Sequence, residues 1–475
     1  MRDGGRTLAA LDLARLRAHI DAALRRARDD GAVVLAAVTF ELEPAADPTA
    51  LALAARRGEE PWFSLERPDA GGQALAGCGC AAALETSGEG RLQTVAASWR
   101  ALCDRAHADR PSAPRGSGLV AVGGFAFAPE DSAGPRWQGF APASLHVPEL
   151  AVARHEGHVS ATVAVAAAPD DTGEELLARA VRRVDELPRS AALKLLDPDP
   201  AGRAQIVAQL TPQHYEAAVA RAVERIAAGE LEKVVLAREV SVHAPTAYEP
   251  GALIGVLREA FPACFVFAVG RGAATFLGAS PELLVRRDGH RASTVALAGS
   301  ARRSADPAVD DHLGEQLLRS AKDREEHAIV ARRIERTLRA CALWVTTESE
   351  PQLVRIANIQ HLATAIRAQL DDPLGALELA ALLHPTPAVG GEPWERAGPL
   401  IRALEGIDRG WYAGGVGWTD ASQDGEFCVA LRCALLRGAH AGCYAGVGVV
   451  RDSDPAAELA ETEIKLQALL PLLAG

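Results

Sequence analysis

Three stretches near the end of the chain decide the fold: YAGGVGWTD at residues 412–420, GEFCVALRCALL at 425–436 and CYAGVGVVRD at 443–452. Each is an apolar run of strand length, and turn residues separate them, namely Asp424 and the segment RGAHAG at 437–442. Strands joined by such short turns pair antiparallel, because a parallel pair needs a crossover of a dozen or more residues. We therefore expect an α+β protein with large antiparallel sheets, and not a doubly wound dinucleotide-binding fold.

The same kind of pattern continues towards the N-terminus. TFLGASPELLVRRDG at residues 275–289 is predicted to be a strand, and a long helix is predicted over roughly residues 311–341. Earlier segments also alternate strand-like and helical runs. We divide the chain into an N-terminal part, residues 1–204, which we expect to belong to the same sheet system, and a C-terminal part, residues 205–475, which carries most of the motifs.

The composition excludes several classes of function. A formal net charge of −12 over 475 residues leaves no basic footprint for duplex nucleic acid. No apolar run reaches the ~20 residues of a membrane-spanning helix, and the mixed-charge N-terminus lacks the features of a secretory signal. Cys78 and Cys80 form the only close pair among eight cysteines, so we expect reduced thiols and no zinc site. We expect a cytoplasmic protein whose partners are neither nucleic acid nor membrane.

The last predicted helix carries charge on its apolar side. In PAAELAETEIKLQALLPLL at 455–473, the residues Glu458, Glu461 and Lys465 share a sector with leucines at about 100° per residue, whereas Glu463 lies across the helix. Burying a charged group costs free energy unless the group is paired or binds a metal. The three residues therefore indicate either a surface stripe of ion pairs or one wall of a functional site.

A second helix has one acidic residue on its apolar side. In KDREEHAIVARRIERTLR at 322–339, Glu326 lies in the apolar arc with Ile329 and Val330, whereas Glu325 lies on the charged side. Glu326 is therefore either a border residue that forms a salt bridge or an inward-facing ligand.

Arg432 is the third charged residue on an apolar face. With the period of two that a strand imposes, its side chain shares a face with Cys428, Ala430 and Ala434, whose small size leaves room for a bound carboxylate. An arginine exposed at a sheet edge is the alternative. Two inward carboxylates favour a hard divalent cation such as Mg²⁺, which takes oxygen ligands. With an arginine and a lysine nearby, they predict a small substrate that carries several carboxylates.

The motifs of the C-terminal part resemble those of the chorismate-utilising enzymes, and among these most closely the isochorismate synthases. The matching stretches are KVVLAR (233–238), FLGASPELLVRRDG (276–289), LAGSARR (297–303), KDREEH (322–327), QHLATAI (360–366), LHPTPAVGGEP (383–393), GGVGW (414–418), GEFCVALRCALL (425–436), AGVGVV (445–450) and AETEIKL (460–466). The N-terminal part matches more loosely, mainly through GLVAVGGFAF at 118–127, which resembles the menaquinone-pathway branch. The resemblance implies an aminodeoxychorismate synthase-like fold of stacked antiparallel sheets flanked by helices, with Mg²⁺ and chorismate bound between the sheets.

The resemblance also implies roles for individual residues. By motif it assigns metal binding to Glu326, Glu461 and Glu458, the general base to Lys233, the general acid to Glu282, and substrate contacts to His361, Arg432, Lys465, Gly299, Ser300, Gly446 and Gly448. Arg432, Lys465 and the backbone of Gly446 to Gly448 match the group that holds the enolpyruvyl carboxylate. On this interpretation the charged side of the last helix forms one wall of the active site.

Isochorismate formation needs a base and an acid together. Water adds at C2 of the chorismate ring and the hydroxyl at C4 leaves, so a base takes a proton from water while an acid protonates the departing oxygen. A buried lysine and a desolvated glutamate suit these two tasks. Without the resemblance, Lys233 could equally point to solvent at a helix–strand junction, and Glu282 could equally be a turn residue.

Several sibling reactions share this set of motifs and stay open as alternatives. Salicylate synthases form isochorismate and then eliminate pyruvate. The large subunits of anthranilate and aminodeoxychorismate synthases take ammonia from a glutaminase partner, but this chain carries Lys233 and Ala298 where those enzymes tend to differ. A non-catalytic ligand-binding relative would have lost one of the charged residues, and none is lost here. We expect an isomerase that uses water, has no glutaminase subunit, and serves menaquinone or siderophore biosynthesis.

Overall fold

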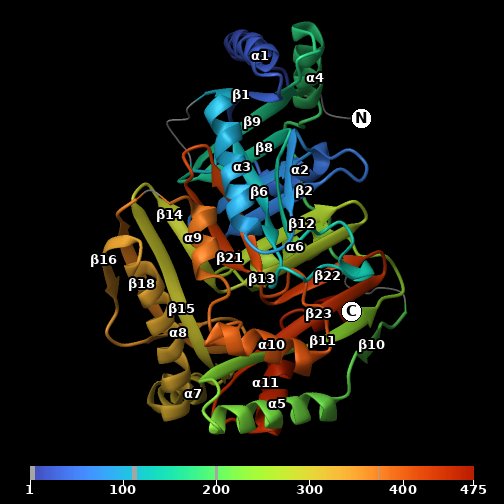
Figure 1. Ribbon diagram of the computed structural model, residues 1–475. Coiled ribbons are helices and arrows are strands. Elements are labelled where there is room, and N and C mark those ends of the chain that lie inside the picture. Colours follow the sequence, from blue (N-terminus) through green and yellow to red (C-terminus); the bar gives the residue numbers. More distant parts are fainter. Residues whose placement is uncertain (1–5, 110–114, 198–201, 373) are drawn as a thin grey trace.

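Two large β-sheets form the centre of the computed structural model, which describes the 475-residue chain except residues 1–5, 110–114, 198–201 and 373 (Figure 1). Within the described residues the larger sheet has thirteen strands. Their order is β10 (Gln205–Ala208), β11 (Lys233–His243), β23 (His440–Val449), β22 (Cys433–Arg437), β13 (Ala274–Ser280), β12 (Phe265–Arg271), β2 (Trp62–Arg67), β3 (Gln73–Cys78), β8 (Leu150–His155), β9 (His158–Ala167), β1 (Val34–Leu42) and β5 (His107–Ala108), with β19 (Gly391–Glu392) beside β11. β1 and β5 are parallel, and the other pairs are antiparallel.

The smaller sheet has ten strands within the same described residues, and all their pairs are antiparallel. Their order is β16 (Ala342–Thr347), β18 (Ile359–Leu370), β15 (Arg291–Arg302), β14 (Leu283–Asp288), β21 (Gly425–Val429), β20 (Gly415–Asp420), β6 (Val120–Phe125), β7 (Ala143–Val147) and β4 (Ala82–Thr86), with β17 (Gln352–Arg355) beside β18. The predicted α+β class with large antiparallel sheets is therefore confirmed.

Both parts of the chain contribute strands to both sheets. β2 pairs with β12 in the larger sheet, and β6 pairs with β20 in the smaller one. The largest cluster of buried apolar side chains contains residues of both sheets, such as Phe267 and Phe427, and packs between them. The division of the chain at residue 204 stays a prediction.

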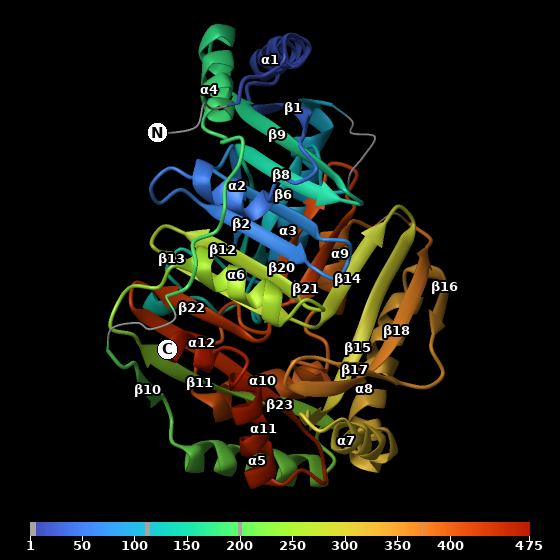
Figure 2. The same cartoon turned by 180° about the vertical axis from the view of Figure 1, so that it is seen from behind.

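Helices cover the outer faces and both ends of this pair of sheets (Figures 1 and 2). They are α1 (Ala10–Asp30), α2 (Pro48–Ala55), α3 (Arg91–Arg105), α4 (Gly173–Asp185), α5 (Pro212–Ala227), α6 (Pro250–Ala260), α7 (Pro307–Arg319), α8 (Ala321–Arg339), α9 (Ala376–Leu383), α10 (Trp394–Glu405), α11 (Pro455–Leu466) and α12 (Leu470–Ala474). α1 and α4 pack on β1 and β9 at one end of the molecule, and α5 packs on α11 at the other. α8 lies against β15 and β18 of the smaller sheet.

The stretch 425–436, predicted to be one strand, crosses from one sheet to the other. It forms β21 in the smaller sheet and most of β22 in the larger sheet. Arg432 lies between them with a backbone φ of 46°. Residues other than glycine rarely adopt this conformation, and it interrupts the alternation of side chains along the strand. The prediction that Arg432 shares a strand face with Cys428, Ala430 and Ala434 is therefore wrong.

The predicted strand at 275–289 divides in the same way. β13 ends at Ser280 in the larger sheet, and β14 begins at Leu283 in the smaller one. Pro281 lies at the crossing, where it interrupts the ladder because it has no N–H to donate. The two crossings are bonded to each other, since Val429 N donates to Glu282 O at 3.0 Å and the Ser280 hydroxyl donates to Val429 O. Glu282 and Arg432 thus both lie where the sheets meet.

The long helix predicted over 311–341 is two helices, α7 and α8. Ser320 separates them, because it ends α7 and its side chain accepts a hydrogen bond from Asp323 N as the N-cap of α8. The predicted apolar arc of α8 is confirmed, and Glu326 is buried in it with Ile329.

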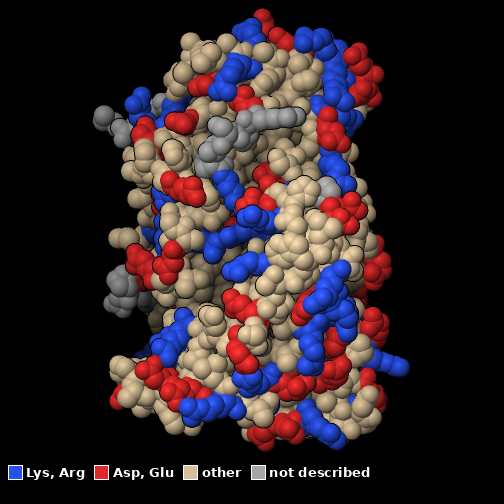
Figure 3. Space-filling model, turned by 90° about the vertical axis from the view of Figure 1, so that its left-hand side faces the viewer, with Lys and Arg blue, Asp and Glu red and all other residues tan. Residues whose placement is uncertain are grey.

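The surface carries both signs of charge. On the face in Figure 3, acidic and basic side chains are interspersed, and a group of Lys and Arg side chains lies near its middle. Among the described residues, no helix combines the length and the apolar character needed to cross a membrane. The eight cysteines are free thiols.

Candidate active site

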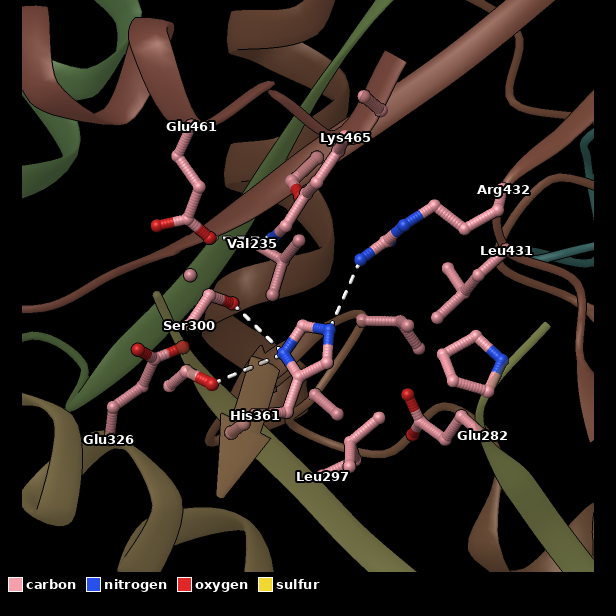
Figure 4. A pocket seen from close by; sticks show the side chains of 18 of the residues that line it. Val235, Glu282, Leu297, Ser300, Glu326, His361, Leu431, Arg432, Glu461 and Lys465 are labelled. Carbon is pink, nitrogen blue, oxygen red and sulfur yellow. Dashed lines mark hydrogen bonds and ion pairs between the residues drawn. The ribbon is translucent and has the colours of Figure 1, made fainter. Parts of the chain in front are cut away.

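A pocket at the junction of the two sheets gathers most of the residues that the sequence singles out (Figure 4). Ten of them line it: Glu282, Gly299, Ser300, Glu326, His361, Arg432, Gly446, Gly448, Glu461 and Lys465. They come from both crossings, from strands of both sheets and from helices α8 and α11. Lys233 and Glu458 are not among the lining residues. Lys233 contacts Glu326, and Glu458 lies one helical turn before Glu461, and both of these partners line the pocket.

Lys233 begins β11 and has no exposed surface, so its predicted burial is confirmed. Its Nζ lies 2.9 Å from Glu326 Oε1, in an ion pair without hydrogen-bond geometry. Gly448 on the neighbouring strand makes this contact possible, because a Cβ at that position would overlap Glu326 Oε1 and lie 2.8 Å from Lys233 Cε. The lysine amine is therefore held next to the pocket by one carboxylate.

Glu282 lies at the crossing between β13 and β14, with only 4% of its surface exposed. Burial raises the pKa of Glu282 to about 8, although Lys233, Arg432 and Lys465 act to lower it. The carboxyl group therefore keeps its proton at neutral pH and can serve as a hydrogen-bond donor or an acid. Glu282 lies in the short link between the two strands, and its side chain lines the pocket.

His361 lies between the two sides of the pocket in Figure 4. Arg432 Nη2 lies 3.2 Å from His361 Nε2, and His361 Nδ1 lies 3.2 Å from Gly299 O and 3.1 Å from Ser300 Oγ. Because arginine only donates and a carbonyl oxygen only accepts, Nδ1 carries the proton and Nε2 accepts. Burial, with Arg432 and Lys465, lowers the pKa of His361 well below its ordinary value, so the ring is neutral. A neutral imidazole in a fixed tautomer thus orients the Arg432 guanidinium.

A bulge in β15 supports this histidine. The ladder with β18 shifts its register between Ala298 and Ser300, and Gly299 has a φ of 74°. A side chain at that φ would be strained, and a Cβ there would lie 3.1 Å from Asp323 Cβ. The bulge therefore requires glycine and leaves Gly299 O and Ser300 Oγ facing His361.

Glu461 and Lys465 form an ion pair along the inner side of α11. Lys465 Nζ lies 2.7 Å from Glu461 Oε1 and donates to Gly446 O at 2.9 Å. Burial acts to raise the pKa of Glu461, but Lys465 and a hydrogen bond from Ser300 outweigh it and lower the pKa, so Glu461 is ionised. Glu463 is exposed on the opposite side. The predicted division of this helix into an inner and an outer charged side is confirmed.

Glu458 lies one turn earlier on α11 and is buried beside the pocket. Lys322 Nζ donates to Glu458 Oε1 at 2.6 Å. Burial raises the pKa of Glu458, whereas the bond from Lys322 acts to lower it. The nearby charge of Glu461 also raises this pKa, which places the two carboxylates in each other's field.

The oxygen donors of the pocket fit a hard cation held by two carboxylates. Glu326 and Glu461 line the pocket on the same side of His361 in Figure 4. Over the described part of the chain, no three His, Cys, Asp or Glu side chains gather in a group that could enclose a metal. Mg²⁺ does not need such a group, because it is usually held by one or two carboxylates together with waters and substrate oxygens.

Two further lining residues, Tyr412 and Val389, lie in stretches that the sequence singles out but receive no role from it. A Cβ at Gly446 would lie 2.8 Å from the Tyr412 hydroxyl oxygen, so the absence of a side chain at this glycine lets the phenol pack over β23. The Tyr412 ring stacks on Tyr444 with 5.2 Å between ring centroids. Tyr412 adjoins the GGVGW motif, but only the packing of β23 against residues 411–414 brings its hydroxyl to the pocket.

These features define an enzyme site for a small anionic substrate, and comparisons with known proteins give its class. The model of the chorismate binding enzyme family matches residues 22–474, and the chain belongs to this family. A salicylate biosynthesis isochorismate synthase of Pseudomonas aeruginosa is 39% identical over 97% of this chain and 94% of its own length. The isochorismate synthase MenF of Bacillus subtilis is 34% identical over 75% of each chain. The solved structure of MenF, the menaquinone-specific isochorismate synthase of Escherichia coli, has a TM-score of 0.77 and 26% identity over 97% of this chain and 100% of its own.

Proposed function

We propose that this chain is an isochorismate synthase, an isomerase that converts chorismate into isochorismate. Family membership and the names of relatives that match along most of the chain support this reaction. One structural observation carries it: a buried lysine amine and a protonated glutamate approach the same pocket from different sides. Lys233 contacts Glu326 on one side of His361, and Glu282 lies on the other (Figure 4).

The two residues divide the proton transfers between them. In its neutral amine form, Lys233 accepts a proton at Nζ from the water that attacks C2, and Glu282 donates its proton to the C4 oxygen as that group leaves. One water enters and one leaves, so the product is an isomer of the substrate. Arg432, oriented by His361, grips a substrate carboxylate with its planar fork of donors.

We propose Mg²⁺ as the cofactor, held by Glu326 and Glu461, with Glu458 as a further acidic group behind them. When bound, Mg²⁺ neutralises the ring carboxylate of chorismate and withdraws electron density from the ring. The shared pocket of the two carboxylates supports this proposal. Removal of divalent cations with EDTA should abolish turnover, and added Mg²⁺ should restore it.

Product analysis tests the proposed reaction. Purified protein is incubated with chorismate and Mg²⁺, and the products are resolved by chromatography. Isochorismate as the sole product is the expected result. Salicylate with pyruvate would instead indicate a salicylate synthase, and an amination product that requires ammonia would indicate one of the aminating siblings. Absence of any product would contradict enzymatic function.

We further propose that isochorismate from this enzyme supplies menaquinone or siderophore biosynthesis in the cytoplasm, without a glutaminase subunit. The names of the relatives point to both routes, since one is menaquinone-specific and another belongs to salicylate biosynthesis. The eight free thiols suit a reducing compartment. Expression in bacterial strains that lack either a menaquinone-specific or a siderophore-specific isochorismate synthase distinguishes the two routes by which growth defect is relieved.

A further inference from the structure

A buried ion pair behind the pocket connects three of the segments that line it. Arg409 is 2% exposed and Glu405 is 5% exposed, and both oxygens of Glu405 accept hydrogen bonds from the Arg409 guanidinium. Glu405 ends α10, and Arg409 lies in the segment that leads from α10 to β20. Neither side chain lines the pocket. The pair therefore acts on the site only through other residues.

The pair fills a gap along one edge of β11, the strand that begins with the proposed base. The short strand β19 pairs with the start of β11 and β10 pairs with its end, and Val235 N still donates to Gly390 O at 2.7 Å. In the gap between them, Arg409 Nη2 donates to Val235 O at 2.9 Å and Glu405 Oε1 accepts from Ala237 N at 2.6 Å. Two side chains thus make the hydrogen bonds that a neighbouring strand would otherwise make, and they satisfy the buried backbone groups Val235 O and Ala237 N.

Arg409 also holds two other walls of the pocket. Its Nη1 donates to Val389 O at 2.8 Å. Its guanidinium carbon lies 4.1 Å from the Phe127 ring centroid and 5.8 Å from that of Tyr412, in the arrangement that a desolvated arginine favours. Val235, Val389 and Tyr412 all line the pocket. One guanidinium therefore contacts lining residues from three separate segments.

We infer that Arg409, fixed by Glu405, is a positioning residue for isochorismate formation, an inference that rests on the proposed function. Lys233 lies two residues before Val235 in the same strand, so a displacement of β11 moves the amine relative to the substrate. A shift of about 1 Å in such an arrangement can lower a rate by about 10²-fold. A lysine could not replace Arg409, because its single ammonium group cannot meet two carbonyl oxygens and a carboxylate in one plane.

The test compares Arg409→Lys with Arg183→Lys, a matched control in the N-terminal part. Arg183 is also 2% exposed and also buried in ion pairs, which it makes with Glu60, Glu149 and Glu186. Both substitutions should lower the melting temperature. At a temperature where each variant is fully folded, Arg409→Lys should lower kcat for chorismate by at least about tenfold and by more than it raises KM, whereas Arg183→Lys should leave both within twofold.

A second variant keeps the inference testable if Arg409→Lys does not fold. Glu405→Gln retains an acceptor for Ala237 N and one bond to Arg409, so kcat should fall by about threefold to tenfold with a smaller change in melting temperature. A folded variant, Arg409→Lys or else Glu405→Gln, with kcat within twofold of the wild type would overturn the inference, as would an equal loss of kcat in Arg183→Lys. Failure of the wild-type protein to convert chorismate would instead contradict the proposed function, so the two failures are distinguishable.

Discussion

Buried charge is arranged differently in the N-terminal part of the molecule and in the pocket. In the N-terminal part, Arg183 meets Glu60, Glu149 and Glu186 and also donates to Ala55 O at 3.0 Å. One cation there has several fixed partners. Removing the guanidinium would leave three partly buried carboxylates without their shared partner, so the network favours a single structure.

In and beside the pocket, carboxylates and lysines meet one to one. The pairs are Glu326 with Lys233 at 2.9 Å, Glu461 with Lys465 at 2.7 Å and Glu458 with Lys322 at 2.6 Å. A single contact to a lysine leaves donors and acceptors of both groups available to a ligand, and lysine is a compact charge on a flexible stem. We infer that a cation with several carboxylate partners maintains the fold, whereas a carboxylate paired with a single lysine stays available for binding and proton transfer.

Lys233→Ala should have the largest effect on activity. Loss of the amine that we propose takes the proton from water should lower kcat by about 10³-fold, while calorimetry should still detect chorismate binding in the presence of Mg²⁺. Near-normal turnover of a folded variant would remove Lys233 from the mechanism. Its ion pair with Glu326 would then serve only to stabilise the fold.

Glu461→Gln should give the next largest effect. The amide keeps the shape of the side chain but loses the charge that attracts a cation, so the apparent Mg²⁺ affinity should weaken by at least about tenfold. Glu463→Gln is the matched control, because Glu463 lies on the exposed side of the same helix. Magnesium titrations followed by calorimetry without substrate and by kcat with it measure the change, and equal curves for both variants would move the metal elsewhere.

The pH dependence of kcat should reveal Glu282. Its pKa of about 8 means that the protonated, proton-donating form is present below that pH and is lost above it. We therefore expect kcat to decrease as the pH rises through about 8, approaching a tenfold fall per pH unit. Glu282→Gln should remove both this dependence and most of the activity. A wild-type profile that stays level from about pH 7 to about pH 9.5 would rule out Glu282 as the acid.

Arg183→Met should lower stability but have the smallest effect on activity. Removal of this guanidinium leaves three carboxylates without their shared partner, which should lower the free energy of unfolding by about 3 kcal/mol. Urea unfolding measures this loss, and kcat and KM for chorismate should stay within twofold at a temperature where the variant is folded. A large loss of kcat in the folded variant would erase the distinction between the two kinds of buried charge.

Sequence patterns predicted those parts of the site that depend on a single element. The inner side of α11 follows from helical periodicity alone, and the structure separates Glu461 from Glu463 as predicted. Glu326 is buried on the apolar arc of α8 for the same reason. The antiparallel class also follows from local signals, because short turns between strands leave no room for a crossover.

The parts that depend on contacts between elements could not be predicted in this way. Nothing in LRCA around Arg432 signals a change of sheet, since the left-handed conformation there falls on a residue that rarely adopts it. At the other crossing, between β13 and β14, Pro281 is a sequence signal from which the end of the strand could have been predicted. The contacts of Tyr412 and Arg409 depend on the packing of residues 405–414 against β11 and β23, which no periodicity describes.

The origin of the new hydroxyl oxygen is the most direct test of water activation at this site. Chorismate is converted by the wild-type enzyme with Mg²⁺ in H₂¹⁸O, and isochorismate formed early in the reaction is examined by mass spectrometry. If water activated by Lys233 attacks C2 while Glu282 protonates the leaving oxygen at C4, each isochorismate molecule carries one ¹⁸O at C2. Isochorismate without ¹⁸O would contradict this chemistry, because its oxygen would then have moved within the substrate.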